Sequence, residues 1–273
     1  MLAKNRLYFR EFFMLKSLPY TVLLLSSLTL SSLTLLSSTA SAETTVKENK
    51  VMVPAFKANY TILRGGDAVG KASRELQYLN NGMAKYSYHT DIEWLIFSDT
   101  REETSTVKLN GNKVTPTNYV YKREGTGRDK YFEWSYDTAN NTATNKKKKK
   151  TKNIEFPENI QDSLSYHLQH RLNLISKPEQ KQFVYPVIKS SGSMKNYVYQ
   201  YDGEEEIMLP YGLVKTVKFK REVVEKKRVT YAWFAPELDY LLVKLYQIKG
   251  DVEQFEAQLE SVDVMNSNES TTK

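Results

Sequence analysis

Residues 72–92, "ASRELQYLNNGMAKYSYHTDI", decide the fold class of this chain. Ala72–Leu79 and Lys85–Ile92 are short segments in which apolar and polar side chains alternate, the pattern of a strand with one buried face. Asn80-Asn81-Gly82 separates them, and Asn-Gly is the dipeptide that tight hairpin turns favour, because both of its residues tolerate positive φ. The stretch therefore predicts a β-hairpin.

The same alternation continues along the chain. Phe56–Ile62 has an apolar residue at every second position, and Tyr131–Asp137 places three aromatic residues on one face. Further strands are predicted at 101–109, 113–122, 196–200, 204–209, 213–222, 228–234, 241–249 and 252–264, with turns at 64–67, 110–112, 202–203 and 250–251. Many short strands with frequent turns predict a mainly β fold, either one antiparallel, strongly curved sheet or an incomplete barrel.

One segment interrupts the strands with a helical pattern. Asn159 suits an N-cap, and Asp162, three residues later, suits the reciprocal position of a capping box. The apolar residues then recur at helical spacing until Ser176-Lys177-Pro178 ends the pattern, and they are Leu164, Leu168, Leu172 and Ile175. We expect one amphipathic helix of about four turns, packed on the sheet.

The first 42 residues have the order of a cleavable secretory signal. Basic side chains precede an apolar run at 21–36, and Ala40-Ser41-Ala42 follows, so cleavage is expected between Ala42 and Glu43. The run is about 16 residues, shorter than the ~20 that span a bilayer, so no permanent transmembrane segment is expected after cleavage. Either Met1 or Met14 is compatible with this signal. The protein is therefore predicted to be exported to the periplasm.

Three parts of the chain follow from these patterns. They are the signal peptide at 1–42, a single β-rich domain at 43–265 and a flexible, polar C-terminal tail at 266–273. The sequence contains no cysteine, which excludes disulfides, thiolate catalysis and cysteine-ligated metal centres. The domain must therefore be stabilised by its core.

The positive net charge comes from two short segments. The chain is +7: the first 42 residues contribute +3, the six lysines of "ATNKKKKKTKN", 143–153, contribute +6, and the remainder is −2. A nucleic-acid-binding protein usually spreads its basic residues over a surface and places aromatic residues among them, so nucleic acid is not expected as a partner. We interpret the lysines as a solvated hairpin that discourages edge-to-edge pairing, with contact to anionic lipid or lipopolysaccharide as the alternative.

Few residues suggest catalysis or metal binding. His167 and His170 lie three residues apart on the predicted helix and, with Asp162 and Ser163, form a polar cluster along its flank, whereas His89 is remote in sequence. Zinc needs at least a third protein ligand and no HExxH motif is present, so no metal and no cofactor are expected. No G-x-S-x-G or phosphate-binding loop occurs either, and no catalytic residue is assigned.

The aromatic content is the feature most suggestive of function. The chain has 19 Tyr, 11 Phe and 3 Trp, and an aromatic concave face of a sheet can hold an apolar or amphiphilic ligand. The candidates for such a face are Trp94, Phe97, Phe132, Trp134, Tyr136, Tyr231 and Trp233, of which Trp94, Trp134, Tyr136 and Trp233 are the main ones. The alternative is that these residues form the core, because strands favour aromatic residues in any case.

Several stretches in a fixed order resemble a known family. They are Phe56-Lys57-Ala58-Asn59-Tyr60 with Gly66 and Gly70, Pro116-Thr117-Asn118-Tyr119, Gln161-Asp162-Ser163-Leu164-Ser165-Tyr166, Tyr211-Gly212 before Thr216-Val217-Lys218, and Thr230-Tyr231-Ala232-Trp233-Phe234-Ala235-Pro236 leading to Leu241-Leu242-Val243-Lys244. Together they resemble the exported bacterial family known as domain of unknown function 3108. The resemblance implies an envelope protein with a mainly antiparallel β fold and no assigned activity.

These observations favour a non-enzymatic periplasmic protein that binds or carries an apolar or amphiphilic envelope component or a protein partner. The aromatic content, the export signal and the missing catalytic motifs support it. Two alternatives remain: a hydrolase that acts on an envelope polymer or ester with carboxylates or His167, and a structural or assembly factor without a small ligand.

Overall fold

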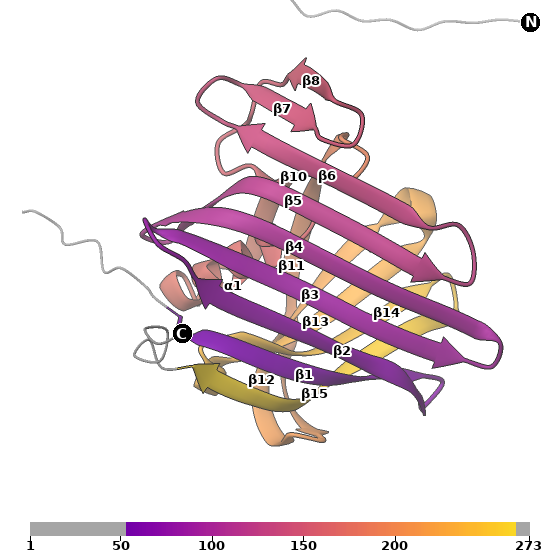
Figure 1. The fold of residues 1–273 in the computed structure, drawn as a ribbon. Coiled ribbons are helices and arrows are strands. Elements are labelled where there is room, and N and C mark those ends of the chain that lie inside the picture. The colour runs from indigo at the N-terminus through magenta and orange to yellow at the C-terminus, as the bar shows by residue number, and fades with distance from the viewer. Residues whose placement is uncertain (1–52, 266–273) are drawn as a thin grey trace, which may run out of the picture. The chain divides into compact units, whose positions relative to one another are not determined.

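All fifteen strands of residues 53–265, the part of the chain that the computed structural model describes, join in one curved sheet (Figure 1). The predicted signal peptide, its cleavage site at Ala42 and Glu43, and the predicted tail at 266–273 lie outside the described residues. The prediction of a mainly β fold, built as one strongly curved sheet that does not close into a barrel and carries one helix, is confirmed.

The elements follow in chain order. They are β1 Ala55–Arg64, β2 Asp67–Tyr78, β3 Met83–Trp94, β4 Phe97–Asn110, β5 Lys113–Gly125, β6 Lys130–Asp137, β7 Thr142–Asn145, β8 Lys150–Asn153, β9 Gln161–Asp162, α1 Ser165–Ser176, β10 Gln182–Ile188, β11 Met194–Leu209, β12 Gly212–Val223, η1 Val224–Lys226, β13 Arg228–Ala235, η2 Pro236–Leu238, β14 Leu241–Lys249 and β15 Val252–Met265.

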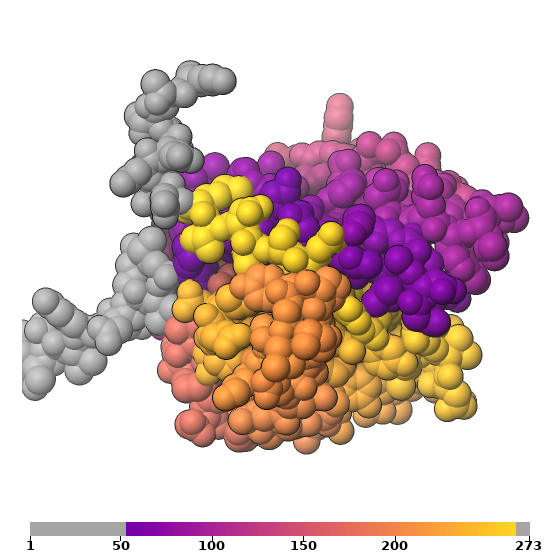
Figure 2. Space-filling view, turned by 90° about the horizontal axis from the view of Figure 1, so that it is seen from below, coloured from indigo at the N-terminus to yellow at the C-terminus, as the bar shows by residue number. Residues whose placement is uncertain are grey.

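The sheet is a meander whose first and last strands meet in its middle. The spatial order is β8-β7-β6-β5-β4-β3-β2-β1-β15-β14-β13-β12-β11-β10-β9. β1 pairs antiparallel with β15, and Figure 2 shows the two, indigo and yellow, side by side. All other neighbours pair antiparallel except β9, which lies parallel to β10 because the helix and a loop connect them. The two halves of the meander curve toward each other, with α1 between them (Figure 1).

The tight turns explain how the strands succeed one another. Asn81 and Gly82 both have positive φ, 59° and 70°, between β2 and β3, as the Asn-Gly signal predicts. The predicted turns at 64–67, 110–112 and 250–251 are also confirmed. The predicted turn at Asp202-Gly203 is wrong: β11 continues through it, and the register with β12 shifts there. A bulge uses the same residue types as a turn, so the sequence pattern does not distinguish them.

The helix begins later than the sequence predicts. Asn159 has φ 60° and precedes the short strand β9, so it does not cap the helix. The Asp162 carboxylate caps instead, because it accepts hydrogen bonds from the backbone N–H groups of Leu164 and Ser165 at 2.8 and 2.7 Å. The Asp162 carboxylate also accepts a bond from the Ser105 hydroxyl of β4, and this contact fixes the helix start against the sheet.

The helix is buried on two sides, not along one stripe alone. Leu164, Leu168 and Leu172 pack in the larger core cluster, as the predicted stripe requires. The opposite side packs into a second, aromatic cluster that includes Phe183, Tyr185, Tyr199, Phe219 and Phe234. His170 lies among these rings with 1% of its surface exposed, so our expectation of a polar flank at this residue is wrong. The helix therefore fills one end of the space inside the sheet.

Side chains join β5 and β6, in one half of the sheet, to β9, the helix and the segment after β10 in the other half. Gln161 donates to the Val114 carbonyl of β5, and Gln169 accepts from the Val114 N–H, both at 2.8 Å. Farther along, Trp134 of β6 donates to the Ser190 carbonyl at 3.0 Å. The Trp134 ring lies so close to Gly192 that a Cβ there would approach it to 2.7 Å. Hydrogen bonds from two amide side chains and one indole thus take the place of backbone hydrogen bonds between neighbouring strands.

The lysine run forms a hairpin, as predicted. Lys146 to Lys149 connect β7 to β8, and Lys148 N–H bonds to the Asn145 side chain at 2.8 Å. β8 is the exposed edge of the sheet. Lysines at this position oppose pairing with another sheet edge.

Asp162→Ala is expected to lower the free energy of unfolding by about 3 kcal/mol, because three buried donors lose their acceptor. Urea denaturation measures this. Asp137→Ala is the control, since Asp137 also accepts two hydrogen bonds, from Asn140, but at an exposed turn, where about 0.5 kcal/mol is expected. Equal losses in the two variants would contradict the role assigned to Asp162.

Candidate functional site

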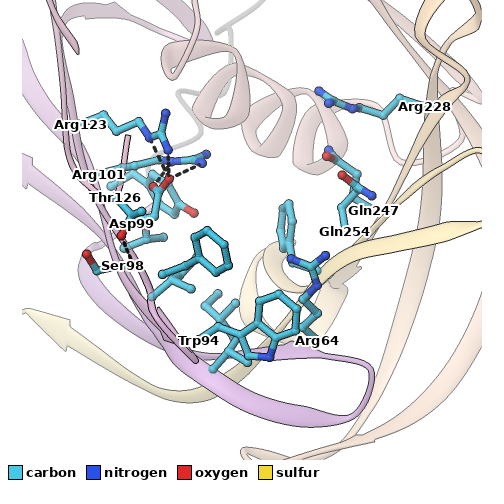
Figure 3. Close-up of a pocket in the computed structure, with 17 residues that line it drawn as sticks. Arg64, Trp94, Ser98, Asp99, Arg101, Arg123, Thr126, Arg228, Gln247 and Gln254 are labelled. Atoms are coloured by element: carbon cyan, nitrogen blue, oxygen red, sulfur yellow. Dashed lines mark hydrogen bonds and ion pairs between the residues drawn. The ribbon is translucent and has the colours of Figure 1, made fainter. Parts of the chain in front are cut away.

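The space inside the sheet contains a cavity of about 520 Å³ at the end formed by the β1–β2, β3–β4 and β5–β6 hairpins (Figure 3). We call it the outer cavity. Its apolar lining consists of Ile62, Val69, Ile92, Trp94, Phe97 and Phe255. Cavities that bind small molecules in proteins are usually about 300–1,000 Å³ with mostly apolar walls. The outer cavity has this size and character.

A bonded cluster of charged residues lies on one wall of the outer cavity. Asp99 accepts hydrogen bonds from the Nε atoms of Arg101 and Arg123 at 2.5 and 2.7 Å (Figure 3). Burial alone raises the pKa of the Asp99 carboxyl, but the two guanidinium groups outweigh burial and lower it. Asp99 is therefore ionised, and its charge compensates part of the charge of its two partners.

Two further arginines line the outer cavity without a carboxylate partner among residues 53–265. The Arg64 guanidinium lies 4.4 Å from the centre of the Trp94 ring, a cation–π contact visible in Figure 3. Arg228 extends from the wall opposite to the Asp99 cluster (Figure 3), and its Nε is buried without an acceptor. The lining of the outer cavity thus carries excess positive charge.

A second cavity of about 190 Å³, which we call the inner cavity, adjoins the first. Tyr88, Gln247 and Phe255 line both, so the two lie on one path from the hairpin end of the sheet to the helix. The start of the helix forms one wall, with Ser163, Leu164, Tyr166 and His167. The helix therefore limits the depth of the space.

The inner cavity is lined by two cations and one carboxyl group. Arg74 and Arg221 come from β2 and β12, in opposite halves of the sheet. Glu103 of β4 accepts a hydrogen bond from the Tyr119 hydroxyl at 2.8 Å. Burial raises the pKa of Glu103 to about 7, against the opposing effect of that bond and of Arg74. Near neutral pH the carboxyl is therefore only partly ionised.

The geometry around His167 does not provide a nucleophile and base. Burial, and then the charges of Arg74 and Arg221, hold the pKa of His167 well below its usual value, so its imidazole is neutral. Among the described residues no hydrogen bond joins His167 to a serine or a carboxylate. Nucleophilic catalysis needs such a bond to activate the attacking hydroxyl. The site as described is suited to binding.

The predicted aromatic residues lie in different places. Trp94 lines the outer cavity, as does Phe97, whose ring stacks 6.4 Å from that of Trp94. Trp134 and Tyr136 are buried in the larger core cluster, Trp134 at the closure of the sheet. The Trp233 indole donates a hydrogen bond to the Glu205 carboxylate at 2.6 Å, and the ammonium groups of Lys218 and Lys244 lie over its ring. Thr230, which lines the inner cavity, lies on the opposite face of β13. The four main candidates are therefore not brought together.

The predicted helix-flank cluster divides in the same way. Ser163 and His167 line the inner cavity. Asp162 is fully buried at the helix start, where burial raises its pKa to about 6 despite the hydrogen bonds it accepts. His170 bonds through Nδ1 to the Tyr185 hydroxyl at 2.9 Å, and burial lowers its pKa to about 3. His89 is exposed on the outer face of β3.

The sequence analysis missed the arginines of the cavities. One signal was available: Arg74 lies between Ala72 and Leu76 in the alternation of β2, so it shares the inward face of the strand with two buried apolar residues. A charged residue at an inward position is rare unless it has a partner. No group of three His, Asp or Glu side chains that could hold a metal ion occurs within 53–265. Within the same range no helix is both long and apolar enough to cross a membrane.

Comparisons with known proteins give the family and agree with the fold. The crystal structure of a β-barrel-like protein of domain of unknown function DUF1849 from Brucella abortus is similar, with a TM-score of 0.50 and 11% identity over 79% of this chain and 100% of that chain. A Bacteroides fragilis protein with a YmcC-like fold gives a TM-score of 0.31 and 10% identity over 76% of this chain and 95% of that one. At these identities the likeness concerns the fold alone.

No functionally curated protein matches the sequence. The family described as "Protein of unknown function (DUF3108)" matches residues 59–252, which include every residue of both cavities except Gln254, Phe255 and Ala257. This match confirms the resemblance that the sequence motifs indicated. The chain therefore belongs to the DUF3108 family.

Proposed function

We propose that this protein is an exported, non-enzymatic carrier that binds one molecule of an apolar or amphiphilic envelope component inside the curved sheet. The observation that carries the proposal is the outer cavity of about 520 Å³, with Trp94, Phe97 and Phe255 in its wall. The inner cavity extends it and is lined by polar groups. An apolar space with polar groups at one end matches a molecule with a chain and a head group.

Export to the periplasm is part of this proposal and rests on the order of basic, apolar and small residues in 1–42. The hydrolase alternative has less support, because His167 is neutral and is not bonded to a serine or carboxylate within the described residues. Binding requires only the cavity and its lining.

The tip of the β3–β4 hairpin supports exchange of the ligand with a lipid surface. Leu95 and Ile96 are 83% and 85% exposed, beside Trp94 and Phe97 of the outer cavity. Leu95 has φ 56°, a conformation that favours glycine. The other two-residue turns with positive φ, at 65–66, 111–112 and 250–251, place glycine there. Two exposed apolar side chains at the cavity would insert among acyl chains.

The binding proposal is tested by native mass spectrometry of the protein purified gently from the periplasm. We expect a mass that begins at Glu43 plus one bound small molecule, which organic extraction removes and identifies. Val69→Trp fills the outer cavity and should lower occupancy at least about tenfold. Ala68→Trp is the matched control, because the neighbouring residue is exposed on the other face of β2.

A bare mass for the unmodified protein would contradict the proposal. So would a ligand that both tryptophan variants retain equally, since that ligand would be bound elsewhere.

The hairpin is tested with vesicles of phosphatidylethanolamine and phosphatidylglycerol. The Leu95→Gly/Ile96→Ser double variant should bind them roughly tenfold more weakly, because two exposed apolar side chains no longer insert. Its melting temperature should be unchanged or higher, since glycine suits the turn. The control is Met208→Ser/Leu213→Ser, which removes an exposed apolar pair from the β11–β12 hairpin. Equal weakening in the two double variants would contradict a specific role of the tip.

A further inference from the structure

Arginine and lysine are segregated in this fold. Six of the eight arginines in residues 53–265 line the two cavities, whereas none of the 24 lysines in that range does. If the two types were interchangeable, lysine would dominate the cavities as it does the surface. Guanidinium groups are planar, permanently charged and able to bond a carboxylate or phosphate through two N–H groups at once. The segregation indicates that the cavities need this chemistry.

The inner pair of arginines has no anionic partner in the described residues. Arg74 is only 7% exposed; its guanidinium donates to the Tyr86 hydroxyl at 3.3 Å and lies 5.2 Å from the Tyr88 ring. Arg221 lies 4.2 Å from the Tyr197 ring, and its Nε is buried without an acceptor. Neither forms an ion pair with a carboxylate. A buried charge without a counter-charge is strongly unfavourable, so an anion beside this pair would be stabilising.

The neighbouring titratable groups supply only part of that negative charge. The Glu103 carboxyl is partly protonated near neutral pH because burial raises its pKa to about 7. His167 is neutral, since burial and the two guanidinium charges depress its pKa. Arginine does not lose its proton to escape burial. The inner cavity therefore retains a net positive charge.

We propose that the ligand is an acidic amphiphile whose anionic head group, a carboxylate or a phosphate, binds Arg74 and Arg221 in the inner cavity while its chain occupies the outer cavity. This inference rests on the proposed function and adds the class and orientation of the ligand. The outer cavity supplies the apolar walls for the chain, and its own bonded arginines are already partly compensated by Asp99.

The opposite orientation, with the head group at the rim, has weaker support. Arg64 at the rim is exposed and solvated, and Arg101 and Arg123 share Asp99. Arg228 has no carboxylate partner among the described residues either, but it is only half-buried, whereas Arg74 is buried. Water screens an exposed charge, so an anion gains less there than beside a buried guanidinium. The largest gain in binding free energy for an anion is expected beside Arg74, the most buried arginine of the two cavities.

The ligand class is tested by titrating extracted protein with dodecanoate, dodecyl phosphate and dodecanol, followed by calorimetry. We expect at least one acid to bind ten times or more tightly than the alcohol. Arg74→Gln and Arg221→Gln should each reduce this preference about tenfold and leave dodecanol binding unchanged. Arg128→Gln is the control, since Arg128 is exposed and lines neither cavity.

The outcomes separate the two proposals. If none of the three compounds binds, the proposed function fails. If all three bind equally, or if the glutamine variants keep the preference, the function stands and the acidic head group is wrong. Preference for the carboxylate points to a free fatty acid, and preference for the phosphate to a phospholipid.

The orientation is tested by quenching of Trp94 with brominated dodecanoate. Bromine at the far end of the chain should quench more strongly than bromine beside the carboxylate, because Trp94 lines the outer cavity only. Trp94→Phe gives the background from the other two tryptophans. Stronger quenching by the bromine beside the carboxylate would overturn the inward orientation.

The pH dependence of binding tests the head-group position through Glu103. The charged and titratable groups facing Glu103 are Tyr119, Asp162, Arg74, Arg101 and Tyr88. Glu103 gains its negative charge as the pH rises through about 7, so the affinity for a permanently charged, sulfonate-headed acyl chain should fall between about pH 6 and pH 8. Glu103→Gln should remove this dependence. A pH-independent affinity in the unmodified protein would place the head group away from Glu103 and overturn the proposal.

Discussion

The bonds from Gln161 and Gln169 to the two backbone groups of Val114 are the constraint on which the rest of the structure depends. β9 has only two residues, so the end of the sheet lacks a strand long enough to pair with β5. The two amides satisfy the N–H and C=O that a ladder would otherwise satisfy. Because the helix carries Gln169, the same contact that joins the edges also holds the helix inside the sheet.

Closure by side chains explains why the interior contains a cavity. A small closed barrel fills its centre with its own inward side chains. Here the helix and its aromatic cluster fill one end, and the hairpins at the other end enclose space that they do not fill. Between the two ends, the inward positions that line the inner cavity carry Arg74, Glu103 and Arg221 in place of large apolar residues. The core and the cavity are thus two ends of one interior.

The strands could be predicted from the sequence because alternation and Asn-Gly turns are local signals, and the sheet agrees with them. How deeply a side chain is buried inside the sheet, in contrast, depends on residues far away in the sequence. Tyr131–Asp137 shows which residues share a face, but only the contact with the turn between β10 and β11 decides that Trp134 is core while Trp94 borders a cavity. The helix start was misplaced for a similar reason, since the Asp162 carboxylate is shared with Ser105 on a distant strand.

Two departures from local rules lie along the same path through the molecule. Leu95 occupies a backbone conformation that glycine fills in the comparable turns, and Arg74 occupies an inward position where its neighbours are apolar. Each is unfavourable by these rules, and although Arg74 contacts Tyr86 and Tyr88, no carboxylate within the described residues pairs with it. One lies at the hairpin end of the outer cavity and the other in the wall of the inner cavity. Such departures are expected where function requires them, and the ligand that we propose would use both, because its transfer would involve the apolar tip and its anion would neutralise the buried cation.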